Sequence, residues 1–344
     1  MNWFAWRQHR KQFLVMGVIL ALFAALTIPT GLHFWHAYQQ TLASCAQNPA
    51  NPTCSDLSST LFQSTIDQVL FHLVPVAVLF LPVIFGIFWG VPLLSREYSE
   101  GTNSLAWTQS ISRRKWLSVK LVWTLTATAV FAGAFAALLT WWSKTPNTLN
   151  MNRFNFVFFG SQGIVPAAYD LFTVALGIML GAWFRKTMVA VGVVLALFIA
   201  IVLIVVPNFV RPHYMSPITV TAPMGPDLAA QKIPNGANWI LTRDTLDGNG
   251  KTVNDVFPSA PQQCQKIIQQ MEARTGGGGI RVKADPGGGD PIDACLNAAG
   301  WHETATYQPS YRYWGFQEIE SGIYLGLTAI TVSATYWLVL RRDA

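Results

Sequence analysis

The chain has 344 residues, of which 51% are hydrophobic and only 12% are charged, about half the charged share of soluble proteins. This composition excludes an ordinary soluble globular protein and favours a protein of the lipid bilayer. The net charge of +6 could indicate nucleic acid, but the cations cluster in short segments next to apolar runs. We therefore attribute them to membrane topology and expect no nucleic-acid partner.

Six apolar blocks are each long enough to cross a bilayer, because about 20 residues of α-helix cover its hydrocarbon core. Lipid offers the backbone no hydrogen bonds, so blocks this continuous are predicted to be helices. The predicted spans are Phe13–Trp35, Leu70–Leu94, Ser118–Trp142, Gly163–Phe184, Thr187–Pro207 and Ser321–Leu340. An all-α polytopic membrane protein follows, with five spans in residues 13–207 and the sixth, with a short tail, in 320–344.

The first twelve residues, MNWFAWRQHRKQ, mix aromatic side chains with cations. This mixture suits the membrane–water boundary, so residues 1–12 predict a short interfacial helix, with a frayed terminus as the alternative. The apolar run that follows exceeds a signal-peptide core and has no clear cleavage site, so we expect it to be retained as a span.

The distribution of Lys and Arg predicts that both termini are cytoplasmic. The inner segments would then be 1–12, 95–117, 185–186 and 341–344, and they hold eleven of the 23 Lys and Arg residues. The two short outer segments, 36–69 and 143–162, hold only Lys144 and Arg153. Short segments carry the orientation signal, since long ones cross regardless of charge. We therefore expect a multi-pass protein of the plasma membrane.

The four cysteines all fall in outer segments: Cys45 and Cys54 in the first, Cys264 and Cys295 before the last span. Cysteines in an oxidising compartment favour disulfides, so we predict one bond within each segment, with free thiols as the alternative. His33 and His36 have helical spacing near the first pair, but no set of ligands completes them, and we expect no metal site.

The second span contains Pro75, Pro82 and Pro92. Proline bends a membrane helix and frees backbone carbonyls, so Pro75 and Pro82 are candidates to line a transport pathway. A bend that serves only packing is the alternative.

The fourth span contains Asp170, the only acid within the predicted spans. An intramembrane carboxylate is a candidate cargo contact or helix-pairing switch, although its position near the outer end also suits a structural or solvated role. In the same span, Gly177 and Gly181 predict close helix contact. Only Arg185 and Lys186 separate the fourth and fifth spans, which predicts a tight hairpin.

Residues 208–319 are polar and rich in Gly, Pro, Asn and Gln, and they predict a small extracytoplasmic domain. The stretch TLDGNGKT ends like a phosphate-binding loop, but Thr245 stands where that motif needs glycine, so DGNG is interpreted as a tight turn. The sequence contains neither G-x-S-x-G nor H-E-x-x-H. We expect no catalytic residues in this chain.

The segment between the second and third spans, SREYSEGTNSLAWTQSISRRKW, is compact and charged. Gly101 permits a turn, and Thr102 can cap a helix that ends in the cations around Arg113. Such a helix could lie along the membrane and present charge to a cytoplasmic partner. The alternative is a loop whose cations only orient the chain.

This segment resembles the membrane subunits of type-two ABC exporters, the permease family of the ABCG-like fold. Their actinobacterial members show R-E-x-x-x-G-T after the second span, then an A-W-T-Q-like stretch and R-x-x-W. The matching residues here are Arg96, Glu97, Gly101 and Thr102, then Ala106, Trp107, Thr108 and Gln109, then Arg113 and Trp116. The likeness extends to the six spans, the short hairpin and the basic tail.

The resemblance implies that residues 95–117 include a cytoplasmic coupling helix that contacts an ATPase subunit. The residues expected to couple are Arg96, Glu97, Glu100, Gly101, Thr102, Arg113, Arg114 and Trp116. It further implies cytoplasmic ABC ATPase subunits that hold ATP and Mg, a second copy or a related permease, and contact with membrane lipid. This chain itself is expected to bind no cofactor.

The function that follows is that of a permease subunit for export of a hydrophobic or amphipathic compound, such as a drug, antibiotic, lipid or peptide. One alternative is a membrane-anchored receptor or sensor with an extracytoplasmic ligand-binding domain, but the inner segments are too short for an output domain. A membrane enzyme is a third possibility, but it would need more polar partners than Asp170 offers.

Overall fold

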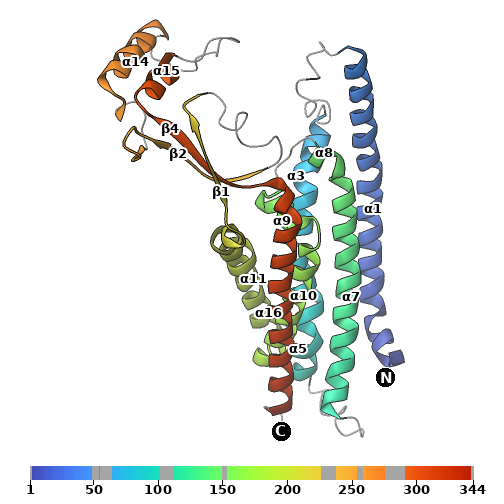
Figure 1. Cartoon of the computed structure of the whole chain (residues 1–344). Helices are drawn as coiled ribbons and strands as arrows, with labels where there is room; N and C mark the ends of the chain where they lie inside the picture. The colour runs from blue at the N-terminus through green and yellow to red at the C-terminus, as the bar shows by residue number, and fades with distance from the viewer. Residues whose placement is uncertain are drawn as a thin grey trace. The chain divides into compact units, whose positions relative to one another are not determined.

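The computed structural model describes residues 2–48, 54, 64–100, 112–148, 153–225, 238–253, 259–275 and 291–341. The chain forms two compact units, a membrane unit (Met1–Tyr214 and Tyr313–Ala344) and an inserted unit (Met215–Arg312). Among the described residues, six helices are long and apolar enough to cross a membrane: Gln12–Gln47, Thr65–Ser99, Arg113–Trp142, Val165–Phe184, Thr187–His213 and Ser310–Arg341. The predicted all-α polytopic class is confirmed, and both termini lie at the same end of the membrane unit (Figure 1).

The first helix, α1 (Asn2–Gln47), runs without interruption. Residues 2–12 are therefore helical, as expected, and lead directly into the first span. No Gly or Pro before Phe13 provides a break, and the aromatic and basic residues there are compatible with helix. Within the membrane unit, α1 packs mainly on α7 (Arg113–Trp142).

The second span is divided at its prolines. It consists of α3 (Thr65–Leu79), α4 (Leu81–Phe85), the π-helical turn η2 (Gly86–Gly90) and α5 (Val91–Ser99). Pro82 and Pro92 stand in the first turns of α4 and α5, where a missing N–H is tolerated, and Pro75 lies inside α3.

The fourth span, α10 (Val165–Phe184), is the central helix of the membrane unit. In its most apolar window 83% of the residues are buried within the chain, against 11% for the first span. The predicted close contact at Gly177 is confirmed, and its partner is the second span. A Cβ added at Gly177 would lie 2.7 Å from the Gly86 carbonyl oxygen, and one at Gly181 would lie 2.6 Å from the Val91 carbonyl oxygen.

The remaining helices complete the membrane unit. They are α8 (Lys144–Thr148), α9 (Phe156–Ser161), α11 (Thr187–Phe198), the π-helical η3 (Ile199–Val210), the 3-10 turn η4 (Arg211–His213) and α16 (Tyr313–Arg341). Arg185, with a left-handed φ of 53°, and extended Lys186 form the tight turn predicted between α10 and α11.

The inserted unit contains a four-stranded antiparallel sheet in the order β1-β4-β2-β3, which the sequence analysis did not foresee. The strands are β1 (Ile218–Pro223), β2 (Trp239–Leu246), β3 (Thr252–Val253) and β4 (His302–Gln308). The predicted DGNG turn joins β2 to β3, with Asp247 Oδ1 accepting from the Asn249 and Lys251 amides at 2.9 and 2.8 Å. Two helices, α14 (Gln262–Thr275) and α15 (Pro291–Ala298), complete the unit.

The inserted unit is shorter than the segment 208–319 expected from composition. The fifth span continues through η3 and η4 to His213, and α16 already begins at Tyr313. The ends of both helices carry polar residues, which an apolar-block criterion does not assign to the spans.

Candidate functional site

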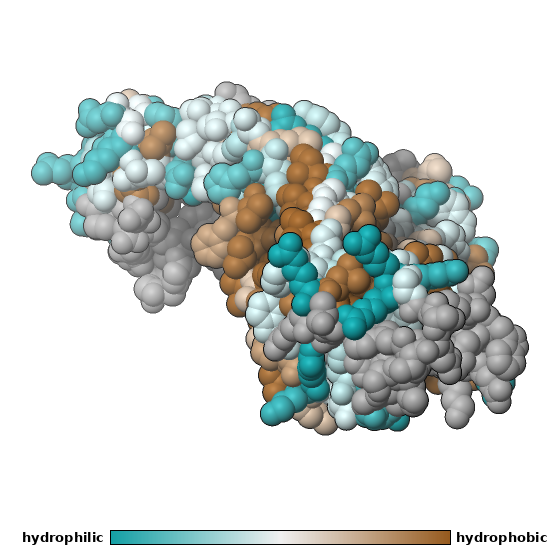
Figure 2. Space-filling view, turned by 90° about the horizontal axis from the view of Figure 1, so that it is seen from below, coloured by the Kyte–Doolittle hydropathy of each residue, from teal (hydrophilic) through white to brown (hydrophobic). Residues whose placement is uncertain are grey.

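The described residues among those expected to couple to an ATPase lie at the end of the membrane unit that carries both termini. Arg96, Glu97 and Glu100 belong to the last turn of α5 and its cap, whereas Arg113 and Trp116 belong to the first turn of α7. They thus flank the connection 101–111, which includes Gly101 and Thr102 and lies outside the described residues. Hydrophilic residues gather over the helix ends seen from below in Figure 2.

Glu97 and Trp116 face into the protein. Lys120 Nζ, in the second turn of α7, donates a hydrogen bond to Glu97 Oε1 and lies 4.4 Å from the centre of the Trp116 ring. Lys120 is 7% exposed and Trp116 is 6% exposed. The ion pair and the contact between Lys120 and the Trp116 ring therefore hold α5 against α7. The sequence analysis missed Lys120 because this residue lies inside an apolar block.

A second group of charges at this end is exposed. Arg96 Nε lies 2.8 Å from Glu100 Oε1, in side chains that are 73% and 52% exposed. Arg114 and Arg185 are also exposed, and the Arg185 guanidinium stacks over the Tyr98 ring at 4.9 Å. An exposed, mainly basic rim of this kind suits docking of an acidic protein surface and contains no group arranged for catalysis.

Helix α5 is also tied to its neighbours on the other side. The hydroxyls of Ser95 and Thr187 lie 3.0 Å apart, which links the end of the second span to the start of α11. Together with the glycine contacts to α10, this makes α5 the element through which the charged end connects to the centre of the bundle.

The pathway candidates are buried. Pro75 and Pro82 lie among the buried residues of α3 and α4. Asp170 is 1% exposed, and its Oδ1 has no hydrogen-bond partner. Asp170 is the only acid within the predicted spans, but the helices of the structure are longer than those spans. The second also contains Asp67 and Glu97, and the sixth also contains Glu318 and Glu320.

Glu320 is at the centre of a buried polar cluster that the sequence analysis missed. Arg211 Nε and Nη2 each lie 2.8 Å from one of its carboxylate oxygens, and Tyr169 Oη donates a hydrogen bond to Glu320 Oε1. The Arg211 guanidinium also covers the Phe159 ring at 3.9 Å. The bidentate pair joins η4 to α16, where the chain leaves and re-enters the membrane unit. Both residues lie just outside the predicted apolar blocks, which is why they were overlooked.

Gln317 extends this cluster to the start of α10. Its Oε1 accepts from the Ile164 and Val165 amides, both at 3.0 Å, and its Nε2 donates to the Phe159 carbonyl at 3.0 Å. Gly163 adopts a φ of +74°, and a Cβ there would lie 2.5 Å from Gln317 Oε1. One side chain of α16 thus caps α10 and fixes its position.

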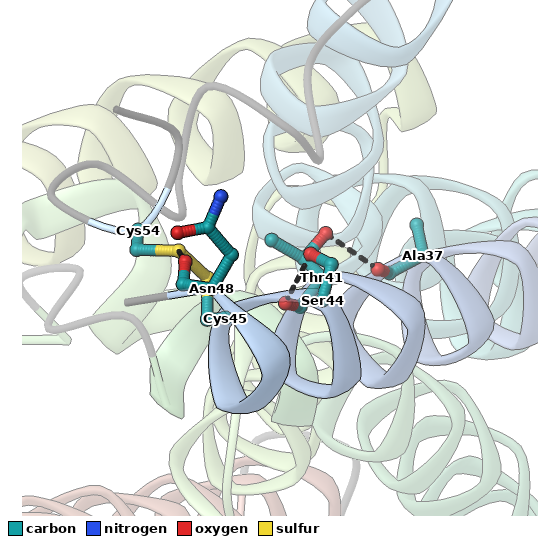
Figure 3. Close-up of a disulfide and its surroundings, with 6 residues drawn as sticks. All are labelled: Ala37, Thr41, Ser44, Cys45, Asn48 and Cys54. Atoms are coloured by element: carbon teal, nitrogen blue, oxygen red, sulfur yellow. Dashed lines mark hydrogen bonds between the residues drawn. A yellow bond between two sulfur atoms is a disulfide. The ribbon is translucent and has the colours of Figure 1, made fainter. Parts of the chain in front are cut away.

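Both predicted disulfides are confirmed. Cys45 and Cys54 are joined at 1.96 Å beside the end of α1, and Cys264 and Cys295 are joined at 1.99 Å between α14 and α15 (Figure 3 shows the first). Each bond stays within its own segment, as expected. The two segments follow the first and fifth spans and therefore lie on the same side of the membrane, opposite the connection 101–111.

Among the described residues, no group of three or more His, Cys, Asp or Glu side chains could hold a metal ion. The family model described as ABC-2 membrane transporter related matches residues 17–211, more than half of the chain. No curated protein and no solved structure matches it.

Proposed function

Because the chain belongs to the ABC-2 membrane transporter related family, we propose that it is the permease subunit of an ATP-driven ABC exporter. The observation that carries the proposal is the family match over the first five spans, which includes both flanks of the connection 101–111. The chain is a multi-pass transport subunit, and ATP and Mg belong to separate cytoplasmic ATPase subunits. A second copy or a related permease completes the membrane part.

Force passes from the connection 101–111 to the bundle through the contacts around α5. Glu97, Lys120 and Trp116 join α5 to α7, so a push on the connection displaces both helices together. The glycine contacts then transmit the displacement of α5 to α10, because two backbones in direct contact cannot move toward each other without a steric clash. Such coupled helix movements are a common means of switching access across a membrane.

The charge distribution supports a cytoplasmic location for the termini and the connection 101–111. The disulfides support the same orientation, because such bonds persist outside the cytosol and both lie in segments opposite the connection. The cargo on this proposal is hydrophobic or amphipathic.

The test is co-expression of the tagged chain with candidate ABC ATPase subunits. We expect one of them to co-purify, and its ATP hydrolysis to respond to hydrophobic or amphipathic compounds only when the permease is present. If every candidate fails to associate with a well-folded permease, the proposal is overturned.

A charge-reversal pair sharpens the test. Arg114→Glu changes an exposed cation on the rim of the proposed docking surface, and Lys251→Glu makes the same change in the exposed turn of the inserted unit. We expect about a tenfold loss of ATPase binding for Arg114→Glu alone, because a like-charge contact opposes docking. Equal binding by both variants would exclude this end as the docking surface.

A further inference from the structure

An open groove of about 860 Å³ lies in the membrane unit between α7, α8 and the starts of α10 and α16. One end is formed by small side chains of α7, among them Gly133 and Ala137, and the other by Lys144 and Arg153. With a helical rise of about 1.5 Å per residue, the apolar part from Gly133 to Trp141 extends about 12 Å. The groove therefore has the length and polarity of an amphiphile, apolar along a helix and cationic at one end.

The two cations have no acidic partner among the described residues. Lys144 is exposed and Arg153 is half-buried, and neither makes an ion pair with a described residue. Arg153 is held by stacking, with its guanidinium 4.7 Å from the centre of the Tyr313 ring. None of the described residues that line the groove is acidic. These were also the only two cations in the short segments assigned to the outside, and the fold brings them to one site.

The Thr140 hydroxyl and the Asn147 side-chain NH2 group of the groove already have partners within the protein. Thr140 Oγ1 donates to the Ala136 carbonyl at 2.6 Å and accepts from the Gly163 amide at 2.8 Å. Asn147 Nδ2 donates to Gln162 Oε1 at 3.0 Å. An occupant therefore meets apolar surface and two positive charges, which favours an anion with an apolar tail.

Two tryptophans place the charged end at the membrane surface. Trp141 and Trp314 line the groove and are 43% and 49% exposed. Exposed tryptophans on membrane helices gather at the level of the lipid headgroups, with the hydrocarbon on one side and water on the other. Lys144, at the start of α8, and Arg153, just before α9, then lie at headgroup depth, and the small residues of α7 lie at acyl-chain depth.

We propose that this groove binds an anionic phospholipid, with an acyl chain along Gly133 to Trp141 and the phosphate between Lys144 and Arg153. A second copy of the chain is a poorer occupant, because a symmetric contact at this site would bring four cations together with no acid from the groove. A zwitterionic lipid would offset its own phosphate charge and fit the two cations less well.

The experiment is native mass spectrometry of the purified full chain in neutral detergent. Phosphatidylglycerol and phosphatidylcholine with identical acyl chains are added in turn, and bound lipid is counted. We expect the wild type to prefer phosphatidylglycerol. Lys144→Gln with Arg153→Gln should lose that preference, with about a 30-fold weaker binding, since each cation near the headgroups contributes a factor of about five.

The matched control is Arg243→Gln with Lys251→Gln, which removes one exposed Arg and one exposed Lys from the inserted unit. It should bind phosphatidylglycerol like the wild type. Equal loss in both double variants, or no preference in the wild type, would overturn the proposal. Arg153→Lys keeps the charge and should keep the preference, and melting temperatures identify any variant that fails to fold.

A filling variant tests the apolar part without changing charge. A Cβ at Gly133 meets no atom within 4 Å, and Ala137 is exposed, so Gly133→Leu with Ala137→Leu should fold and occupy the groove. We expect it to reduce phosphatidylglycerol binding about tenfold. Unchanged lipid binding would overturn the proposal. A change of oligomeric state without a change in lipid binding would also overturn it, and would assign this face to another copy of the chain. The measurement contains no ATPase, so its outcome is independent of the proposed transport function.

Discussion

At the scale of single residues, burial separates charges that look alike in the sequence. Glu97 and Glu100 are one turn apart in a charged stretch, yet Glu97 binds the buried Lys120 and Glu100 pairs with Arg96 in solvent. Exposed pairs contribute little to stability because water screens them, whereas removal of one member of a buried pair leaves an uncompensated charge.

Glu97→Ala should therefore destabilise the protein by about 3 kcal/mol, whereas Glu100→Ala should change stability by less than about 0.5 kcal/mol. Thermal unfolding in detergent measures both. Lys120→Met should restore part of the stability lost in Glu97→Ala, because it removes the unpaired charge. A melting temperature for Glu97→Ala as high as that of Glu100→Ala would contradict the pairing.

Helix α16 also contains a buried and an exposed glutamate, Glu320 and Glu318, whose effects on stability can be compared. Glu320→Gln leaves Arg211 without a counter-charge in a fully buried site, and we expect a loss of about 3–5 kcal/mol. Glu318→Gln removes the same charge two residues earlier on an exposed position and should be nearly neutral. If both variants unfold at one temperature, the buried cluster does not stabilise the bundle.

At the scale of helices, the contact between α10 and the second span depends on glycines, which have no side chain to separate the two backbones. A β-carbon at Gly177 would meet the backbone of the second span, which cannot rotate away as a side chain can. The position of α10 is set further by Gln317, which caps its start from α16. The central helix is thus fixed at its start by hydrogen bonds and along its length by close packing.

Gly177→Ala should cost about 1–3 kcal/mol, because a methyl group must push two backbones apart. Gly192→Ala is the control in α11, where an added Cβ meets no atom within 4 Å. It should stabilise the protein by about 0.5–1 kcal/mol through better helix propensity. Melting temperatures that shift in the same direction in both variants would show that the α10 contact is looser than described.

At the scale of the whole molecule, the six spans and the two disulfides make the orientation testable. All four native cysteines are in disulfides, so an introduced cysteine is the single free thiol. Lys186 and Asn249 are exposed and are separated by one span, and they therefore lie on opposite sides of the membrane.

In intact cells, an impermeant maleimide should label Asn249→Cys and leave Lys186→Cys unlabelled, because the Lys-rich and Arg-rich segments are expected in the cytoplasm. Both variants should react after permeabilisation, which serves as the control. Labelling of Lys186→Cys alone in intact cells would reverse the orientation and, with it, the side on which an ATPase could dock.

The sequence by itself determined the class of the protein, the six spans, the α10–α11 turn, both disulfides and the family. These are properties of local composition, since apolar length, a two-residue connection and cysteine spacing are visible without knowledge of the fold. The family signature is likewise carried by a contiguous stretch of chain.

Only the tertiary structure decided which polar groups meet. Arg211 and Glu320 are 109 residues apart, and Glu97 and Lys120 belong to different spans, so nothing in their local sequence identifies the partner. The groove depends on the same long-range packing, because Lys144 and Arg153 line one groove only when α7, α10 and α16 are placed side by side. Apolar blocks specify that helices form in lipid, but the packing of one helix on another selects the buried pairs, and those pairs define the candidate sites.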